Sequence, residues 1–281
     1  MTTLYATDLD GTLLDADACL SPGTVSIFNS LTVKGVKIAF VTSRTPATVE
    51  PITSRLSNLM PSVVMTGAAI WDFASRSYLQ VHYHNPADAL AINDIFRRHG
   101  VGAFAYTLPR GTNTLHVYHP CGHLTDIERS FVKDRTLNDL KTFHLHTPLP
   151  PGAENHTVLF FAMGEAETMQ EVADDVNQTT SCHADWYPDT YHPGLALLEI
   201  FAHGVSKASG LAELRHISGA DRVVAFGDNL NDMPMLRTAD LSVAVANAHP
   251  QVREAADELI GPNTDDSVIR YIARDSGHPE N

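Results

Sequence analysis

Short apolar runs bounded by turn residues recur towards both ends of the chain and predict buried β-strands. They lie at residues 4–7, 36–42, 61–65, 197–201, 222–226 and 241–245. Segments of helix length lie between several of these runs, at residues 21–33, 47–59, 206–217 and 249–256. Strands that alternate with helices form a parallel sheet covered on both faces. We therefore expect an α/β fold built on a doubly wound parallel sheet.

The middle of the chain has a different pattern. Helical periodicity at residues 86–99 and 165–177 is combined with short strand-like runs at 101–106, 114–118, 156–163 and 182–187. This combination predicts a second α/β unit. We therefore expect a core made of residues 1–81 and 189–281, with residues 82–188 inserted as a separate domain.

The composition limits the classes of partner. With 281 residues and 43% hydrophobic content, the chain can bury a sizeable core. The formal net charge of −14 and the absence of a Lys/Arg cluster argue against a nucleic acid or an anionic membrane surface. No apolar run reaches about eighteen residues, and the first residues do not resemble a signal peptide. We expect a soluble, cytoplasmic protein that acts on a small molecule, as a monomer or a small homo-oligomer.

Two carboxylates follow the first apolar run. Asp8 and Asp10 are separated by one residue, so on a strand they would project to the same side. Ligands of open parallel sheets bind at the carboxyl ends of strands. Gly11 allows a sharp turn, and the Thr12 hydroxyl can brace a carboxylate. The alternative is a solvated strand end followed by an ordinary turn.

The run at residues 36–42 ends in hydroxyls and an arginine just before a predicted helix. The hydroxyl of Thr42, together with the backbone N–H groups at the helix start, could donate to a phosphate oxygen. Ser43 and Arg44 follow directly. Ser and Thr are also ordinary N-cap residues, so a purely structural role is the alternative.

Lys207 stands in the first turn of the helix predicted at residues 206–217, after Gly204. The positive end of the helix macrodipole lies there and disfavours a cation. This position favours an anion-binding role over that of an exposed, solubilising lysine.

The run at residues 222–226 leads into a second acidic segment, which contains Asp228, Asn231 and Asp232. Mg²⁺ takes oxygen ligands, usually one or two carboxylates. Asp228 fits a metal ligand, and Asp232 fits a residue that supports it. An Asx-rich turn explains this segment equally well when it is taken alone. In a doubly wound sheet, however, all four strand ends would gather at one edge.

The motifs DLDGTLL, VTSR, GVSK and GDNLND, in this order, resemble those of the haloacid dehalogenase (HAD) superfamily, Cof-type branch. The resemblance runs from Thr7 to about Ile272. It implies a Rossmann-like core. The interval between Asp8 and Thr42 is too short for a domain, so the insertion lies between Thr42 and Lys207. In this superfamily that position implies an α/β C2 (type IIB) cap, which is typical of sugar phosphatases.

The resemblance also implies an activity. The chain would be a Mg²⁺-dependent phosphatase of small phosphate monoesters, above all sugar phosphates, with an aspartyl-phosphate intermediate. Asp8 would be the nucleophile, and Asp10 would act first as general acid and then as general base. A carboxylate oxygen of Asp8, the main-chain carbonyl of Asp10 and Asp228 would hold the metal.

Further roles follow from the same resemblance. Thr42, Ser43 and Lys207 would surround the phosphoryl oxygens. Asn231 and Asp232 match the family's acidic loop, where Asp232 would orient either a water on the metal or Lys207. Ser43 stands where relatives usually have glycine, which puts in question how closely the loop of Arg44 approaches the phosphate.

Three alternatives remain at this stage. A sugar phosphomutase could use the same aspartyl-phosphate, and a non-catalytic phosphometabolite-binding protein could use the same scaffold. A glycosyltransferase DxD motif would leave Lys207 and Asp228 unexplained.

In the histidine-rich insertion, His82 with His84 and His144 with His146 are spaced as metal pairs would be, although hydrogen-bonded or solvated histidines are commoner.

Overall fold

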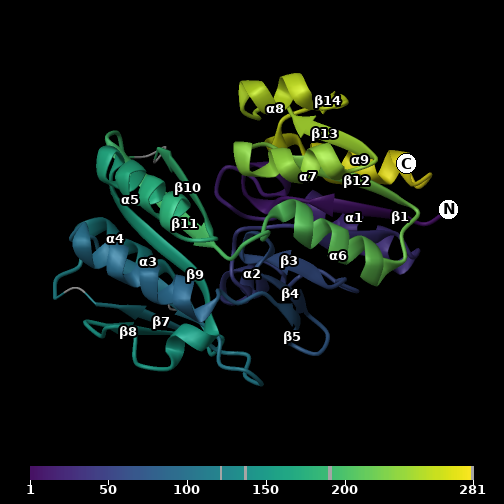
Figure 1. Ribbon diagram of the computed structural model, residues 1–281. Coiled ribbons are helices and arrows are strands. Elements are labelled where there is room, and N and C mark those ends of the chain that lie inside the picture. Colours follow the sequence, from purple (N-terminus) through teal and green to yellow (C-terminus); the bar gives the residue numbers. More distant parts are fainter. Residues whose placement is uncertain (121, 136–137, 189–191, 280–281) are drawn as a thin grey trace. The chain divides into compact units, whose positions relative to one another are not determined.

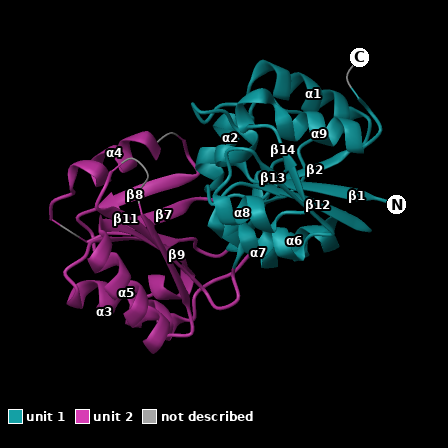
Figure 2. Ribbon diagram, turned by 90° about the horizontal axis from the view of Figure 1, so that it is seen from above, with its two compact units in different colours: residues 1–80, 206–281 teal, residues 81–205 magenta. Residues whose placement is uncertain are grey.

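The computed structural model describes residues 1–120, 122–135, 138–188 and 192–279. The chain forms two compact units, Met1–Gln80 with Ser206–Asn281, and Val81–Val205 (Figure 2). The first unit thus combines both ends of the chain, and the second is inserted between them.

The first unit contains a five-stranded parallel sheet in the order β14-β13-β12-β1-β2 (Figure 1). Its strands are β1 (Thr3–Thr7), β2 (Lys37–Phe40), β12 (Arg222–Gly227), β13 (Leu241–Val245) and β14 (Glu258–Ile260). Its helices are α1 (Pro22–Val33), α2 (Pro46–Thr53), α6 (Lys207–Ser218), α7 (Met233–Thr238), α8 (Pro250–Ala255) and α9 (Ser267–Asp275). Helix α1 packs beside α9, and α6 packs beside α7. The predicted α/β fold with a parallel sheet is confirmed.

The central position of β1 follows from its side chains. Leu4, Tyr5 and Ala6 are buried, and β12 and β2 pair with β1 on either side. Because the chain continues from β1 to β2 on one side and reaches β12 on the other, the strand order reverses at β1. In open α/β sheets such a reversal marks the usual ligand-binding crevice.

The second unit has a six-stranded sheet in the order β10-β11-β9-β6-β7-β8. Its strands are β6 (Ala103–Thr107), β7 (Leu115–His119), β8 (Lys141–Leu145), β9 (Thr157–Glu165), β10 (His183–Pro188) and β11 (Leu195–Phe201). All neighbouring strands run antiparallel except β7 and β8. Its helices are α3 (Pro86–Arg98), α4 (Asp126–Arg135) and α5 (Ala166–Thr179), of which α3 and α5 contact each other.

The predicted position of the run at residues 197–201 is wrong. We expected it in the core sheet, but β11 pairs antiparallel with β9 and β10 in the second unit. The second boundary therefore lies between Val205 and Ser206 rather than after residue 188. The reason is that an apolar run shows that a strand is buried, but not which sheet buries it. Leu198 and Ile200 pack in the hydrophobic cluster of the second unit.

A third, three-stranded sheet consists of β3 (Ser62–Val64), β4 (Ala69–Asp72) and β5 (Ser77–Val81). A parallel bridge between Val41 and Val63 joins it to the segment after β2.

The sequence pattern did not predict β4, β5, β8, β14, α4, α7 or α9. Among the described residues, no helix is both long and apolar enough to cross a bilayer.

Candidate active site

The side chain of Lys207 joins two carboxylates from distant segments. Its Nζ donates to Oδ1 of Asp8 at 2.8 Å and to Oδ1 of Asp232 at 2.6 Å. Lys207 is 1% exposed and Asp232 is fully buried, so the alternative of a solubilising surface lysine is wrong. Lys207 is the first residue of α6, whose start is set by a capping box between Ser206 and Ser209.

Asp232 orients the lysine. While its Oδ1 accepts from Lys207, its Oδ2 accepts from the backbone N–H groups of Asp228 at 2.9 Å and Asn229 at 3.0 Å. Both oxygens are therefore engaged. The contact with Lys207, one of the two roles considered for Asp232, is therefore present.

Asp228 is held by the loop that follows β1. The hydroxyl of Thr12 donates to Oδ1 of Asp228 at 2.8 Å. Gly11 has φ +74°, and a Cβ there would stand 2.4 Å from Oδ2 of Asp228. A side chain at Gly11 is thus excluded both by the backbone conformation and by the carboxylate beside it.

Sequence reasoning missed two residues that hold this loop. Asn247 donates through Nδ2 to the carbonyl of Gly11 at 2.8 Å and accepts from the backbone N–H of Asn263 at 3.0 Å. Asn263 donates to the carbonyl of Leu14 at 2.7 Å. One signal could have identified them: Asn247 and Asn263 each follow closely on a short strand-like run near the end of the chain.

Carboxylate oxygens of Asp8, Asp228 and Asp232 all lie within 4.8 Å of one another. Burial, with Asp232 and Asp228 adding to it, raises the pKa of Asp8 to about 8, although Lys207 opposes this. Burial and Asp232 raise the pKa of Asp228 to about 6. Burial lowers the pKa of Lys207, but Asp232 and Asp8 outweigh it and raise that pKa above its ordinary range. One lysine does not neutralise three carboxylates, so the oxygen-rich cluster fits a hard divalent cation such as Mg²⁺.

Asp10 has a different partner from Asp8. Nε and Nη2 of Arg44 donate to its two oxygens, each at 2.6 Å, and the Asp10 side chain is 51% exposed. The carboxylate of Asp10 is not part of the acidic cluster. The expectation that both carboxylates follow strand alternation is wrong, because β1 ends at Thr7 and a tight turn begins at Leu9.

The hydroxyls of Thr42 and Ser43 lie between β2 and the N-terminus of α2. Helix α2 begins at Pro46 with Thr45 as its N-cap residue, so neither Thr42 nor Ser43 caps it. Thr42 is buried, and its Oγ1 accepts from the backbone N–H of Arg44 at 3.1 Å, which leaves its proton available to another acceptor. Asn231 donates through Nδ2 to Ser43 Oγ at 3.3 Å.

The histidine pairs suggested by spacing have other neighbours. Nδ1 of the buried His84 lies 3.2 Å from Sγ of Cys182. His144 stacks on Tyr118, and its Nε2 lies 2.9 Å from Nδ1 of His116. In the part of the chain that the structure describes, no histidine belongs to a three-residue cluster of metal-ligating groups.

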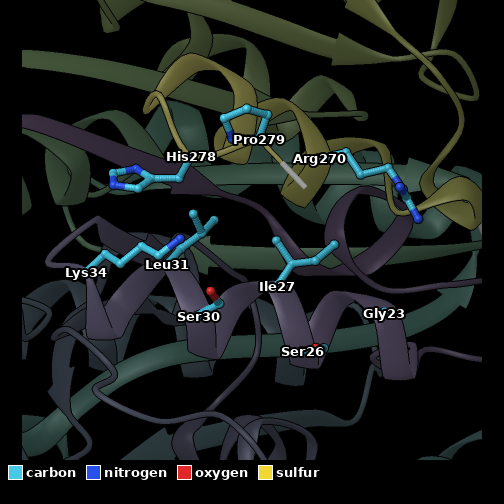
Figure 3. Close-up of a pocket in the computed structure, with 9 residues that line it drawn as sticks. All are labelled: Gly23, Ser26, Ile27, Ser30, Leu31, Lys34, Arg270, His278 and Pro279. Carbon is cyan, nitrogen blue, oxygen red and sulfur yellow. The ribbon is translucent and has the colours of Figure 1, made fainter. Parts of the chain in front are cut away.

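A separate hollow of about 490 Å³ lies between α1 and the residues around and after α9 (Figure 3). None of the four motifs lines it, so it is distinct from the acidic cluster. Its lining residues are Gly23, Ser26, Ile27, Ser30, Leu31, Lys34, Arg270, His278 and Pro279.

Comparison with known proteins places this site in a family. The model of the haloacid dehalogenase-like hydrolases matches residues 5–272. The chain is 26% identical over 276 residues to the pyridoxal phosphate phosphatase YbhA of Escherichia coli (strain K12), covering 96% of this chain and 97% of the relative. It is 25% identical over 276 residues to the 5-amino-6-(5-phospho-D-ribitylamino)uracil phosphatase YitU of Bacillus subtilis (strain 168), covering 96% of each. A solved HAD subclass IIB sugar phosphatase has the same fold, with a TM-score of 0.74 at 19% identity over 99% of this chain and 100% of that one.

The family match covers every motif that contributes to the buried cluster, from Asp8 to Asp232. The curated relatives are matched over nearly their whole length and are phosphatases. This chain belongs to the haloacid dehalogenase-like hydrolases, as an enzyme of their phosphatase branch.

Proposed function

We propose that this protein hydrolyses small phosphate monoesters, sugar phosphates first among them, with Mg²⁺ and through a phosphorylated Asp8. The observation that carries the proposal is the buried contact of Lys207 with both Asp8 and Asp232. A lysine held in this way provides a positive charge for phosphoryl oxygens beside a carboxylate nucleophile.

The contacts of Asp8 indicate which atom attacks. Oδ1 of Asp8 accepts from Lys207, so Oδ2 is the oxygen left to bond to phosphorus. The bond from phosphorus to the ester oxygen breaks as the acyl phosphate forms. Thr42 and Lys207 hold the phosphoryl oxygens during this step.

Asp10 is the proposed general acid and general base. It donates one to the leaving alkoxide and later accepts one from the water that hydrolyses the acyl phosphate. In this structure Nε and Nη2 of Arg44 donate to both oxygens of Asp10. The first step needs a protonated Asp10, so we infer that Asp10 separates from Arg44 when the substrate binds.

The carboxylates of Asp8 and Asp228 and the main-chain carbonyl of Asp10 would hold Mg²⁺. Asp232 is the poorer ligand, since its oxygens already accept three hydrogen bonds, whereas Asp8 accepts one, from Lys207. The bound cation would offset the repulsion between an anionic nucleophile and an anionic phosphate.

The second unit would select the leaving group. The relatives named above act on a pyridoxal phosphate and on a phosphoribitylamino-uracil, both of which are phosphate monoesters of small metabolites. We therefore include both compounds beside sugar phosphates as candidate substrates.

The test is phosphate release from p-nitrophenyl phosphate with and without Mg²⁺. We expect release by the wild type to require the metal and to fall on the order of 10³-fold or more in Asp8→Asn. Asp275→Asn is the control, because this carboxylate of α9 lies outside the cluster, where it accepts from Tyr5 and Arg222. It should keep its activity.

A panel of phosphorylated metabolites would then identify the substrate. Recovery of the phosphoryl group on another sugar hydroxyl, rather than as inorganic phosphate, would favour a phosphomutase. If wild type and Asp8→Asn released phosphate equally from every compound, the nucleophile assignment would be wrong. Phosphate-ester binding without any turnover would favour the binding protein.

A further inference from the structure

The turn that follows β3 has an unusual backbone. Met65 and Thr66 have φ values of +50° and +57°, in the left-handed region. This conformation is uncommon for any residue other than glycine, and for a β-branched residue such as threonine it is an outlier. Strained residues of this kind cluster at functional sites, where the surrounding structure holds them in place.

Hydrogen bonds attach the turn to the VTSR motif. The backbone N–H of Met65 donates to the carbonyl of Arg44 at 3.0 Å, and that of Thr66 donates to the carbonyl of Thr42 at 3.0 Å. The strained turn is therefore fixed to the segment that carries two of the residues assigned to the site.

The other side of the turn packs against the start of α6. A Cβ on Gly67 would stand 2.1 Å from the carbonyl oxygen of Ser206, the residue before Lys207. Only glycine permits this approach of the two backbones. Thr66 thus lies between the segment of Thr42 and the helix that begins with Lys207.

The hydroxyl of Thr66 has no partner in this position. Thr66 is 6% exposed, and its Oγ1 is a buried atom without a hydrogen bond to any described residue. The other buried threonines of the described chain all have hydroxyl contacts, for example Thr12 with Asp228 and Thr53 with the carbonyl of Val49. A buried hydroxyl left without a partner is costly, so an orphan of this kind needs a reason.

We propose that Thr66 is a further substrate-binding residue, whose hydroxyl donates to an oxygen of the bound phosphoryl group. This inference rests on the proposed function, since it concerns the phosphate at the same site. The turn that carries Thr66 is bonded to Thr42 and packs against Ser206, next to Lys207, and Thr42 and Lys207 are the two residues proposed to hold the phosphoryl oxygens. A neutral donor holds the anion without adding another charge to the buried cluster.

The test compares Thr66→Val with Thr66→Ser. Valine keeps the shape and the β-branch but removes the hydroxyl, whereas serine keeps the hydroxyl. Thr53→Val is the matched control, because Thr53 is a buried threonine of α2 in the same unit whose hydroxyl bonds the helix backbone. Binding is measured as the rise in melting temperature caused by inorganic phosphate, with Mg²⁺ in every sample.

We expect Thr66→Val to weaken phosphate binding roughly 10-fold or more, as loss of a hydrogen bond to a charged group does, and Thr66→Ser to restore it. The melting temperature without phosphate should not fall, because the lost hydroxyl had no partner. Where turnover is measurable, KM and the inhibition constant of phosphate should rise with little change in kcat.

Equal phosphate binding by wild type and Thr66→Val would overturn the inference, as would a wild type that phosphate does not stabilise. So would weaker binding in Thr66→Ser that equals that in Thr66→Val. Because phosphate binding needs no turnover, this outcome is independent of whether Asp8→Asn abolishes hydrolysis, which tests the proposed function.

Discussion

At the scale of single residues, the site depends on one buried cation shared between two carboxylates. Burying Lys207 alone would be costly, and its two ion pairs offset that cost. Because Asp232 is also fixed by two backbone N–H groups, it holds the ammonium group at one place. The ammonium group therefore meets Asp8 from a defined direction, as its proposed contact with a phosphoryl oxygen requires.

Gly11 offers a test of this close packing. We expect Gly11→Ala to reduce Mg²⁺-dependent phosphate release roughly 10- to 100-fold, because the new Cβ would displace Asp228 from the position that its hydrogen bond with Thr12 defines. Steady-state rates at several Mg²⁺ concentrations measure the effect. Gly219→Ala is the control: Gly219 has a similar φ of +61°, but a Cβ there meets nothing within 4 Å. Equal activity losses in both variants would show that backbone strain alone, and not contact with Asp228, is responsible.

At the scale of elements, the ends of helices and strands determine what each side chain can reach. The capping box of Ser206 and Ser209 starts α6 at Lys207. In the second unit, His84 precedes α3 and is buried beside Cys182, and the carboxylate of Asp88 in the first turn of α3 acts on the charge of His84. Burial lowers the pKa of His84 to about 4, although the backbone of Ile200 and the carboxylate of Asp88 oppose this.

A pH dependence of stability follows from His84. In the unfolded chain this histidine takes up a proton near its ordinary pKa of about 6.5, but in the folded chain only near 4, so the unfolded state binds more protons between these values. Its contribution to stability is complete above about pH 6.5 and is lost as the pH falls towards 4, by up to about 3 kcal/mol. Urea unfolding of wild type and His84→Gln at about pH 7 and about pH 5 measures it. We expect a smaller loss on acidification in His84→Gln, whereas replacing the exposed His123 by Gln should leave the loss unchanged. An unchanged loss in His84→Gln would contradict the assignment.

At the scale of the whole molecule, each unit has its own sheet and its own hydrophobic cluster. All residues of the first cluster lie outside the segment Val81–Val205, and those of the second lie inside it. The chemistry assigned to Asp8, Lys207 and Asp228 therefore belongs entirely to the first unit. In the proposed function, the second unit could then differ in the leaving group it selects without changing this chemistry.

This division predicts how the chain tolerates excision. Replacing residues 81–205 by a short Gly/Ser linker should leave a folded first unit that still releases phosphate from p-nitrophenyl phosphate but discriminates poorly among metabolites. Replacing only residues 82–188 should lower the melting temperature and promote aggregation, because Leu198 and Ile200 of β11 would lose their sheet and hydrophobic neighbours. Circular dichroism and size-exclusion chromatography distinguish these results. Identical behaviour of the two proteins would argue against the boundary at Val205.

The α/β class and the inserted unit followed from the hydrophobic pattern of the sequence, and the family followed from the motifs DLDGTLL, VTSR, GVSK and GDNLND. Helix starts near Pro22 and Lys207 also followed from local signals. These properties depend on periodicity, capping and turn chemistry, which act over a few neighbouring residues.

Only the tertiary structure decided which groups meet. Lys207 and Asp8 are 199 residues apart in the chain, and the motifs had left open whether Asp232 meets Lys207 or a water. The run that became β11 was recognisably a strand, but its sheet depended on β9 and β10. The strained turn at Thr66 is likewise held by backbone contacts from outside it, with Arg44, Thr42 and Ser206. The hydrophobic pattern predicts that a residue is buried. Which residue it contacts depends on how all segments of the chain pack together.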